Sequence, residues 1–309
     1  MLTTVFFGTP LVAVPFLERL AKTSTVLGVV TSPDRPAGRG YGLAPTEVKR
    51  AAQSLGIPVQ QPERLAGFSI EGAFGKKPDV GIVVAYGHLI PPSVFNEPRQ
   101  GLVNIHFSLV PQYRGAGPMQ WVLIRGETET GVSLFRIEKG LDTGPVFLQG
   151  RQTIDPADDA VTLREKLVAL GLELMDNFLR QLEEGPWAPT PQSGAVSTAP
   201  LLTKEDGRIR WSLRSAGEIV NLIRGTCEWP GAYGVLKGQR MKIRRAESCP
   251  GGAGAPGEII AVEKDRGFLV KCASDSLLVR SLQPEGKKEM DAPRFWNGAR
   301  LSVGDRFEE

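Results

Sequence analysis

The chain has 309 residues, of which 41% are apolar and 23% charged, a composition typical of a globular protein and not of a disordered or membrane one. This length is enough for two domains. No run approaches the 18 apolar residues of a membrane span, and the net charge of +3 indicates no partner by itself.

Two further features concern the cellular compartment. The first residues, MLTTVFFGTP, enter a strand-like run directly and lack the pattern of a signal or transit peptide. The three cysteines, Cys227, Cys249 and Cys272, are widely spaced, which favours free thiols and no zinc site. We therefore expect a cytoplasmic protein.

Short apolar runs alternate with helical patterns through the first half of the chain. The runs cover residues 4–8, 25–32, 79–87, 101–107 and 131–138, and the stretches between them include amphipathic ones such as 10–22, 45–56 and 118–126. Strands that are apolar on both faces and alternate with helices predict parallel βαβ units covered on both sides. The first domain is therefore expected to be an α/β domain.

A helix should close this domain. Thr162 and Glu165 match a capping box, and Gly185 is a typical stop. The apolar stripe at helical spacing consists of Leu163, Leu167, Leu170, Leu174 and Phe178. We expect this helix to pack on the sheet.

The composition then changes. Residues 186–200 contain four prolines and no charge, which is typical of an extended connector. One helix is expected around 215–225, followed by short strands separated by Gly turns, which predict a small β-barrel. We expect an α/β domain at 1–185, a linker at 186–207 and a barrel domain at 208–309.

Basic residues are concentrated in the second half. Between positions 208 and 245 nine Lys or Arg stand against two acids, so this segment should attract a polyanion. The nine are Arg208, Arg210, Arg214, Arg224, Lys237, Arg240, Lys242, Arg244 and Arg245.

The chemistry is expected at the end of one strand. Asn104 and His106 are two residues apart, so their side chains should project from one face of that strand. Ligands of open parallel sheets bind at the carboxyl ends of the strands. A histidine that exchanges a proton and an amide that donates to a developing oxyanion suit acyl transfer. No GxSxG elbow accompanies them, so a substrate group is the expected nucleophile.

A carboxylate should orient this histidine. Asp142 is the best candidate, because Gly140 and Gly144 would let its loop approach a strand end. The residues alone leave equally open that His106 is a core residue, that Asn104 bonds the backbone and that Asp142 caps a turn. His88 has no polar partner in step with it and is not expected to act in catalysis.

These residues are part of a recognisable pattern. NIHFSLVPQYRG at 104–115, followed by GLDTG at 140–144, resembles the folate-dependent formyltransferases, and within them those that formylate methionyl-tRNA. The resemblance extends over nearly the whole chain, through FFGTP at 6–10, SPDRPAGRG at 32–40, VAYG at 84–87, IRWS at 209–212, WPGAY at 229–233 and LQPEGKK at 282–288.

The resemblance implies a Rossmann-like parallel-sheet domain, an OB-like barrel and a reaction. A formyl group would pass from 10-formyltetrahydrofolate to the α-amine of methionyl initiator tRNA, with no metal. Asn104 would stabilise the oxyanion, His106 would assist proton transfer and Asp142 would position His106. Folate would contact Ser108, Leu109, Val110, Pro111, Tyr86, Gly87, Leu89 and Ile90, with backbone at 84–90 and 137–142 around the pterin.

The tRNA contacts implied by the resemblance lie in both halves of the chain. The loop at 34–49 would enter the acceptor stem with Arg35 and Arg39, and Tyr41 would stack on a base. Lys204, Lys287 and Lys288 match positions that are basic in the family. Three sites depart from the family pattern: Tyr41 and Gly42 stand where further basic residues are common, Val110 replaces a Leu, and Phe107 replaces a small residue and could reshape the pocket.

Two other functions remain open. One is formyl transfer from folate to a small amine, such as a nucleotide-linked amino sugar, which would need no basic second domain. The other is RNA binding with an inactive α/β domain, against which the intact Asn104, His106 and Asp142 argue. A monomer is the default expectation.

Overall fold

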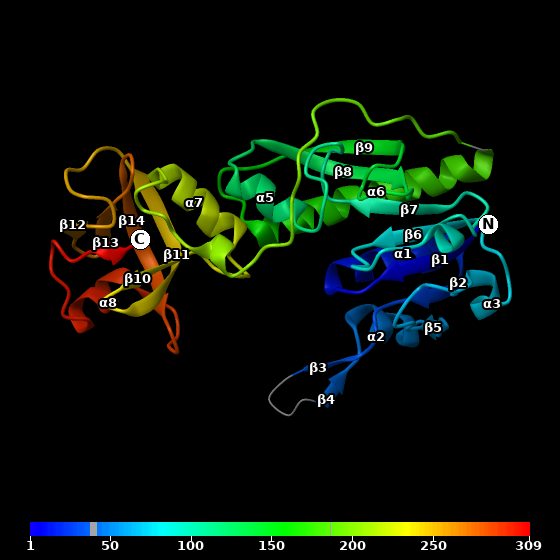
Figure 1. Ribbon diagram of the computed structural model, residues 1–309, viewed down its shortest axis with the longest axis horizontal. Helices are drawn as coiled ribbons and strands as arrows, with labels where there is room; N and C mark the ends of the chain where they lie inside the picture. Colours follow the sequence, from blue (N-terminus) through cyan, green and yellow to red (C-terminus); the bar gives the residue numbers. More distant parts are fainter. Residues whose placement is uncertain (38–41, 186) are drawn as a thin grey trace. The chain divides into compact units, whose positions relative to one another are not determined.

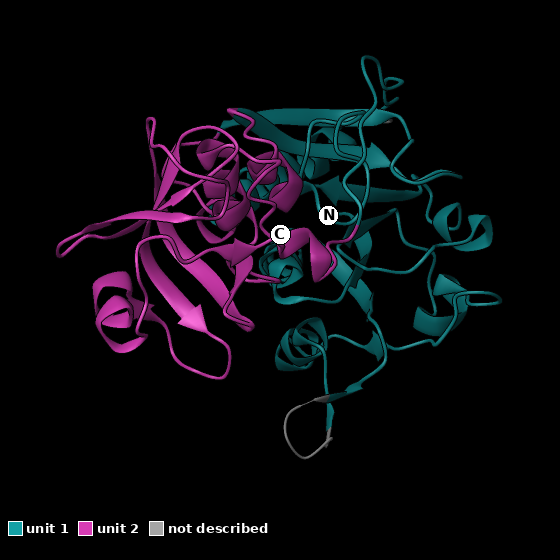
Figure 2. Cartoon of the chain, turned by 60° about the vertical axis from the view of Figure 1, so that its left-hand side comes forward, with its two compact units in different colours: residues 1–118, 129–153, 165–200 teal, residues 119–128, 154–164, 201–309 magenta. Residues whose placement is uncertain are grey.

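The computed structural model describes residues 1–37, 42–185 and 187–309. It divides into two compact units, coloured separately in Figure 2. Unit 1 comprises residues 1–118, 129–153 and 165–200, and unit 2 comprises 119–128, 154–164 and 201–309. The division is thus not a single cut along the chain, because two short internal segments group with the C-terminal part.

Unit 1 is built on a seven-stranded sheet in the order β5-β2-β1-β6-β7-β8-β9, which Figure 1 shows strand by strand. The strands are β1 (Thr3–Gly8), β2 (Thr25–Val30), β5 (Val59–Gln60), β6 (Val80–Val84), β7 (Leu102–His106), β8 (Glu129–Arg136) and β9 (Val146–Thr153). Pairing from β5 through β7 is parallel. The predicted α/β fold with a parallel sheet is confirmed.

The helices of this unit pack on both faces of the sheet. They are η1 (Leu11–Ala13), α1 (Val14–Thr23), α2 (Glu47–Ser54), α3 (Ile70–Phe74), α4 (Pro92–Phe95) and most of α6 (Ala160–Glu184). Phe16 of α1 and Gly171 of α6 meet Ile105 on one face. Ile70 of α3 and Val94 of α4 join the core on the other face. The apolar strands are therefore buried on both sides, as parallel strands usually are.

The order of the strands defines where a ligand can bind. The chain passes from β1 to β2 on one side and then crosses back to β6 on the other side of β1. In such sheets the connections diverge at this reversal and leave a crevice at the carboxyl ends of the strands. His106 ends β7 at this same edge, one strand beyond β6.

The sheet is not parallel throughout. We expected residues 131–138 to form another parallel strand, but β8 runs antiparallel to β7, and β9 runs antiparallel to β8. The amphipathic stretch before β8 forms α5 (Pro118–Ile124), whose Ile124 joins the core of unit 2. β8 therefore returns alongside β7 in the opposite direction, and no parallel βαβ unit forms between them.

The cap of α6 also differs from the expectation. Asp159, and not Thr162, caps the helix, because its Oδ1 accepts hydrogen bonds from the backbone N–H groups of Val161 and Thr162 at 2.9 and 3.0 Å. Thr162 Oγ1 in turn accepts from the Asp159 N–H at 3.0 Å. A carboxylate at this position also interacts favourably with the positive end of the helix dipole. The predicted end before Gly185 is confirmed.

The long connection after β2 contains a small hairpin. β3 (Arg35–Ala37) and β4 (Gly42–Ala44) pair antiparallel, with Arg35 opposite Ala44. Asp34 precedes it, and its carboxylate accepts hydrogen bonds from Lys49 Nζ at 2.6 Å and Gln61 Nε2 at 2.7 Å. These bonds hold the pKa of Asp34 below its usual value. The base of the hairpin is thus fixed to α2 and to the end of β5.

Unit 2 contains a small antiparallel sheet with the path β12-β13-β14-β11-β10-β16, to which β15 adds beside β14. The strands are β10 (Tyr233–Leu236), β11 (Gln239–Cys249), β12 (Ile259–Glu263), β13 (Gly267–Lys271), β14 (Ser276–Pro284), β15 (Met290–Asp291) and β16 (Phe307–Glu308). Its helices are η2 (Glu205–Gly207), α7 (Ala216–Gly225) and α8 (Ala292–Gly298). The helix expected around 215–225 is confirmed, with a capping box between Ser215 and Glu218.

The last residues bring the two ends of this sheet together. Leu236 of β10 pairs with Phe307 of β16. On the other side, Ile259 N–H donates to Asp305 O and Phe307 N–H to Gly257 O, both at 2.8 Å. The sheet therefore curls into the predicted small barrel around Trp211 and Phe307, whose ring centroids are 4.9 Å apart.

The buried stripe of α6 should dominate the stability of unit 1. Leu167 is fully buried, whereas Leu55 at the end of α2 is 42% exposed. Leu167→Ala should lower the free energy of unfolding by about 2–5 kcal/mol, because it removes buried methyl groups and leaves a cavity. Leu55→Ala, the matched control, should change it by less than about 0.5 kcal/mol. Urea unfolding followed by circular dichroism checks this, and equal midpoints for the two variants would contradict it.

Candidate active site

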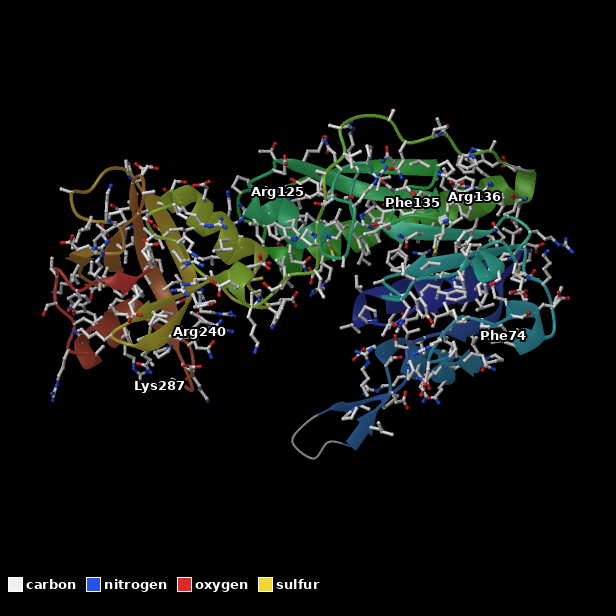
Figure 3. All side chains as sticks on the ribbon, in the orientation of Figure 1. Phe74, Arg125, Phe135, Arg136, Arg240 and Lys287 are labelled. Carbon is white, nitrogen blue, oxygen red and sulfur yellow. The ribbon has the colours of Figure 1, made fainter. Side chains whose placement is uncertain are left out.

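Asn104 and His106 project from one face of β7. Asn104 lies opposite Val83 of β6 on one side and opposite Phe135 of β8 on the other. The His106 ring packs edge-on against Phe135 at 6.1 Å between centroids, and Figure 3 marks Phe135 on β8. The alternation of the strand thus places the pair as predicted, next to an aromatic wall.

The two side chains differ in what they bind. Within residues 1–37, 42–185 and 187–309 the half-buried Asn104 amide has no hydrogen-bond partner, so its N–H groups remain available. The alternative in which Asn104 bonds the backbone is therefore excluded for this part of the chain. An amide held at a strand end with free donors can bind an oxygen of a ligand.

The His106 ring is oriented by a backbone carbonyl. Its Nε2 lies 3.0 Å from Tyr113 O, and His106 is only 6% exposed. A carbonyl oxygen can only accept, so Nε2 must carry the proton of this hydrogen bond. Nδ1 is therefore the nitrogen left to take up or release a proton.

Asp142 lies on the Nδ1 side of the ring. Its Oδ2 is 3.9 Å from His106 Nδ1, and the two side chains are 13% and 8% exposed. This separation is too long for a direct hydrogen bond, so the carboxylate faces Nδ1 without being bonded to it. The structure thus brings together all three residues that the sequence singled out.

The loop of Asp142 depends on its glycines. Asp142 has a φ of 53° and Gly140 a φ of 126°. A Cβ at Gly144 would lie 1.7 Å from Arg136 O, so no side chain fits there. Asp142 Oδ2 also accepts a hydrogen bond from the Gly115 N–H at 2.7 Å. Asp142 therefore does bind a loop backbone, as the structural alternative supposed. The oxygen that does so, Oδ2, is also the one that faces His106.

The segment 108–111 supports the pair from behind. Ser108, Val110 and Pro111 are buried, and Leu109 is half-buried. Ser108 Oγ donates to Gln112 O at 2.7 Å, so this hydroxyl is used within the turn. The side chains predicted to border the folate therefore point largely into the protein.

Two residues that the sequence did not single out hold this segment. Ser133 Oγ donates to Ser108 O at 2.5 Å and accepts from Val110 N–H at 3.1 Å. Gln149 Nε2 donates to Val110 O and to Ser133 Oγ, both at 2.8 Å. Ser133 is fully buried in the apolar strand β8, and a buried polar residue there was the available signal, because such groups are buried only with partners. Gln149 is exposed on β9 and gave no such signal.

Phe107 does not reach the face of the pair. Its ring packs edge-on against Phe16 of α1 at 6.1 Å, on the face where Ile105 meets α6. Successive residues of a strand point to opposite sides, so the bulky side chain fills the core beneath the sheet. The expectation that Phe107 could reshape the pocket finds no support in its position.

The loop after β6 lines a pocket of about 330 Å³. Tyr86, His88, Leu89, Ile90 and Pro91 form one wall and residues 62–66 the other. Tyr86 is buried against Phe7, and burial raises the pKa of its phenol to about 12, so it stays neutral. Leu89 is 88% exposed, and Leu141, beside Asp142, is 62% exposed. Gly87, at a φ of 80°, provides the turn between Tyr86 and this exposed leucine.

His88 has a partner that the sequence did not predict. Its Nε2 lies 3.0 Å from Ser32 Oγ, and Ser32 Oγ is 3.0 Å from Thr9 Oγ1. No polar residue in step with His88 in the sequence pointed to this contact. Thr9 and Ser32 follow β1 and β2, so this contact arises at the sheet edge and not from residues near His88 in the sequence.

The residues expected to contact tRNA are placed in part. Arg35 is exposed at the start of β3, and Lys204, Lys287 and Lys288 are exposed in unit 2. Arg39 and Tyr41 lie outside the described residues. Figure 3 marks Lys287, in the turn after β14, and Arg240 on β11. Arg35 belongs to unit 1 and the three lysines to unit 2.

Much of the basic segment at 208–245 is neutralised within unit 2. Five of its nine cations bind carboxylates or backbone carbonyls: Arg208, Arg210, Arg224, Lys237 and Arg244. Arg240, Lys242 and Arg244 alternate along β11 and so share one face. Burial, followed by the charges of Arg240 and Arg244, lowers the pKa of Lys242. The concentrated positive charge therefore lies on this face of β11.

The described parts of the chain contain neither a metal-binding cluster nor a membrane-spanning helix. No group of three or more His, Cys, Asp or Glu side chains is arranged to bind a metal ion there. Among the helices described, none has the length and apolar character needed to cross a bilayer. The three cysteines are free.

Comparison with known proteins identifies the family. The formyl transferase model matches residues 2–179, and the model of the formyl transferase C-terminal domain matches residues 201–300. The chain is 43% identical to the methionyl-tRNA formyltransferase of Thermodesulfovibrio yellowstonii over 302 residues, 97% of either chain.

Solved structures share the fold at lower identity. The N-formyltransferase of Helicobacter canadensis, in complex with folinic acid and dTDP-3-aminofucose, matches with a TM-score of 0.66 and 18% identity over 90% of this chain and 99% of that one. HypX of Aquifex aeolicus, in complex with tetrahydrofolic acid, matches with a TM-score of 0.64 and 16% identity over 98% of this chain. This chain spans 48% of the length of that HypX. With both of its domains matched and the Asn104, His106 and Asp142 side chains gathered at one sheet edge, the chain belongs to the formyl transferase family.

Proposed function

We propose that the chain transfers the formyl group of 10-formyltetrahydrofolate to the α-amine of methionyl initiator tRNA, as an enzyme of translation initiation. The observation that carries the proposal is the pairing of the free Asn104 amide with His106, whose Nδ1 faces Asp142 at 3.9 Å. The identity of 43% to a methionyl-tRNA formyltransferase over nearly the full length of both chains supports the choice of acceptor. The proposal includes a cytoplasmic location, where translation takes place, and a monomer.

The geometry suggests a role for each side chain. The acceptor amine attacks the formyl carbon, and the carbonyl oxygen becomes an oxyanion to which the Asn104 amide donates a hydrogen bond. His106 takes the proton of the attacking amine on Nδ1, because Nε2 is already bonded to Tyr113 O. The resulting imidazolium faces Asp142, which stabilises its charge. Collapse of the intermediate passes the proton to the folate nitrogen as the carbon–nitrogen bond to folate breaks.

Folate as the donor is supported from two directions. The Helicobacter canadensis and Aquifex aeolicus proteins, which share this fold, were solved with folinic acid and tetrahydrofolic acid. In this chain the two loops assigned to the pterin each present an exposed leucine, Leu89 and Leu141. Exposed apolar side chains beside a pocket can pack against the face of a flat ring such as a pterin. We propose that Tyr86, Gly87, Leu89 and Ile90 line this site and that Ser108, Leu109, Val110 and Pro111 form its rigid support.

A tRNA acceptor is supported by the basic face of β11. Arg240, Lys242 and Arg244 repel one another, and a phosphate backbone would relieve this repulsion. We propose that Lys204, Lys287 and Lys288 extend this surface. We also propose that residues 208–309 form the tRNA-binding domain and residues 1–185 the catalytic domain, as expected from the sequence. Arg35, with Arg39 and Tyr41 beyond it, would contact the acceptor end from the hairpin held by Asp34.

A small amine acceptor is the second candidate. The Helicobacter canadensis protein was solved with an amino-sugar nucleotide, and it shares the fold. The deciding assay is formyl transfer from 10-formyltetrahydrofolate to charged initiator tRNA and, in parallel, to amino-sugar nucleotides. Transfer to the tRNA supports the proposal, and transfer to the sugar alone replaces it.

The first prediction concerns the reacting groups. His106→Ala and Asp142→Ala should each lower turnover by about 10²-fold or more, because proton transfer loses its base or the partner of that base. Affinity for the tRNA, measured by filter binding, should stay nearly unchanged. Wild-type turnover in either variant would reject the mechanism.

Asp142→Asn tests the negative charge of Asp142 separately from its backbone conformation and its hydrogen bond to Gly115. Asn tolerates the left-handed backbone and can still accept from Gly115, but it brings no charge toward His106. Asp265→Asn is the matched control, since Asp265 also has a positive φ, 63° against 53°. Turnover should fall by more than about 10-fold in the first variant only.

The basic face of β11 can be tested through Lys242. Lys242→Ala should weaken tRNA binding and reduce the slope of log affinity against log salt by about one, as expected for one lost phosphate contact. Lys264→Ala, an exposed lysine in the turn between β12 and β13, is the control. Binding titrations over a range of salt concentrations check this. Equal slopes for the wild type and Lys242→Ala would remove β11 from the tRNA surface.

A further inference from the structure

The connector after α6 is bonded to the active-site loops. We expected residues 186–200 only to link two domains, yet the described part, 187–200, belongs to unit 1. Thr190 exchanges two backbone hydrogen bonds with Val146, of 2.7 and 2.8 Å, just after the loop of Asp142. The connector therefore has a fixed path beside the catalytic residues.

A second part of the connector holds the loop of Tyr113. Ser197 Oγ accepts from Tyr113 N–H, and Ser197 O accepts from Arg114 N–H, both at 2.9 Å. Ala199 N–H donates to Arg114 O at 2.7 Å. A Cβ at Gly115 would lie 2.5 Å from Ala199 O, so the close approach of the connector requires this glycine. Tyr113 and Gly115 are the residues whose backbones bind His106 and Asp142.

Gln192 joins the two loops through its side chain. Its Nε2 donates to Asp142 O at 2.9 Å and to Gly144 O at 2.8 Å. Its Oε1 accepts from Arg114 Nη2 at 2.7 Å and from Arg114 Nε at 3.3 Å. Both donors and the acceptor of the amide are thus used, on two loops that lie far apart in sequence.

The amide can take only one orientation. Turning it over would place Oε1 against two carbonyl oxygens and the NH₂ group against a guanidinium, so that all of these hydrogen bonds would be lost. No other uncharged side chain of this length offers two donors on one atom and an acceptor on the other. The hydrogen bonds at position 192 therefore require a glutamine, and another polar residue would not make all of them.

We propose that Gln192 is a positioning residue of the formyl transfer reaction, which fixes the distance between His106 and Asp142. One loop supplies the acceptor for His106 Nε2, and the other supplies the carboxylate that faces Nδ1. Gln192 ties the backbone of Asp142 to Arg114, the neighbour of Tyr113. Without this tie the two loops can shift apart. Displacements of about 1 Å at a reacting group can cost on the order of 10²-fold in rate. The inference rests on the proposed function.

The test compares two substitutions with a matched control. Gln192→Leu removes all the bonds, and Gln192→Glu keeps the acceptor for Arg114 but turns an oxygen toward two carbonyls. Both should lower kcat by about 10-fold or more, with KM for methionyl-tRNA within about twofold of the wild type, because the substrate contacts are untouched. Gln152→Glu makes the same change on β9, where the amide only reaches Thr153 O, and should leave kcat unchanged.

The pH profile separates positioning from general damage. In the Gln192→Glu variant a protonated carboxyl group regains one donor for the two carbonyls, whereas the ionised carboxylate repels them. The kcat of Gln192→Glu relative to the wild type should therefore rise as pH falls from about 6 to about 4, through the usual pKa of a Glu carboxyl, and that of Gln192→Leu should stay flat. Unchanged kcat in Gln192→Leu, or a flat ratio for Gln192→Glu, overturns the proposal.

A measurement without substrate distinguishes this inference from the proposed function. The chain has two histidines, so ¹⁵N spectra of the imidazoles contain few signals, and His106→Ala assigns them. The wild type should show His106 with its proton on Nε2, and Gln192→Leu should shift the His106 signals while those of His88 stay in place. Unmoved His106 signals overturn the positioning role. A wild type that fails to formylate tRNA but shows the shift rejects the proposed acceptor alone.

Discussion

The hydrogen bond from His106 Nε2 to Tyr113 O is the interaction on which the rest of the site depends. It fixes which nitrogen carries a proton and turns Nδ1 toward Asp142. A ring held in this way can exchange a proton only through Nδ1. The Asn104 amide, which has no hydrogen-bond partner among the described residues, projects from the same face of β7. The loop of Tyr113 is in turn held by Ser197, so the orientation of the imidazole depends on residues far along the chain.

The role of each cation in unit 2 also depends on where the fold places it. The sequence has a dense run of cations, but five of the nine are bound to acceptors of the protein itself. Among the described residues, Arg240 and Lys242 on one face of β11 have no ion pair, whereas Arg244 on the same face is bound. Lys242 lies between Arg240 and Arg244, and burial and like charges lower its pKa. Within this dense run, strand alternation decides which cations share a face.

Several elements were predictable because their signals are local. The buried strands of unit 1, the helix with its Leu167 stripe and the capping box of α7 follow from patterns within a few residues. The errors came from competition between such patterns. Thr162 looked like a cap, but Asp159 lies one turn earlier with a better acceptor. The direction of β8 was missed because an amphipathic stretch before an apolar strand looks the same in sequence whether the strand then pairs parallel or antiparallel.

By itself the sequence determined that Asn104 and His106 lie on one face of a strand and that the loop of Asp142 can come close to them. Two residues of a strand separated by one must share a face, and glycines on both sides of Asp142 allow its loop to approach. Only the tertiary structure decided what holds these residues in place. Ser133, Gly115 and Gln192 bond partners that are 25, 27 and 50 residues away. Contacts at such separations leave no periodicity or spacing in the chain, because they exist only once the loops have folded onto the sheet edge.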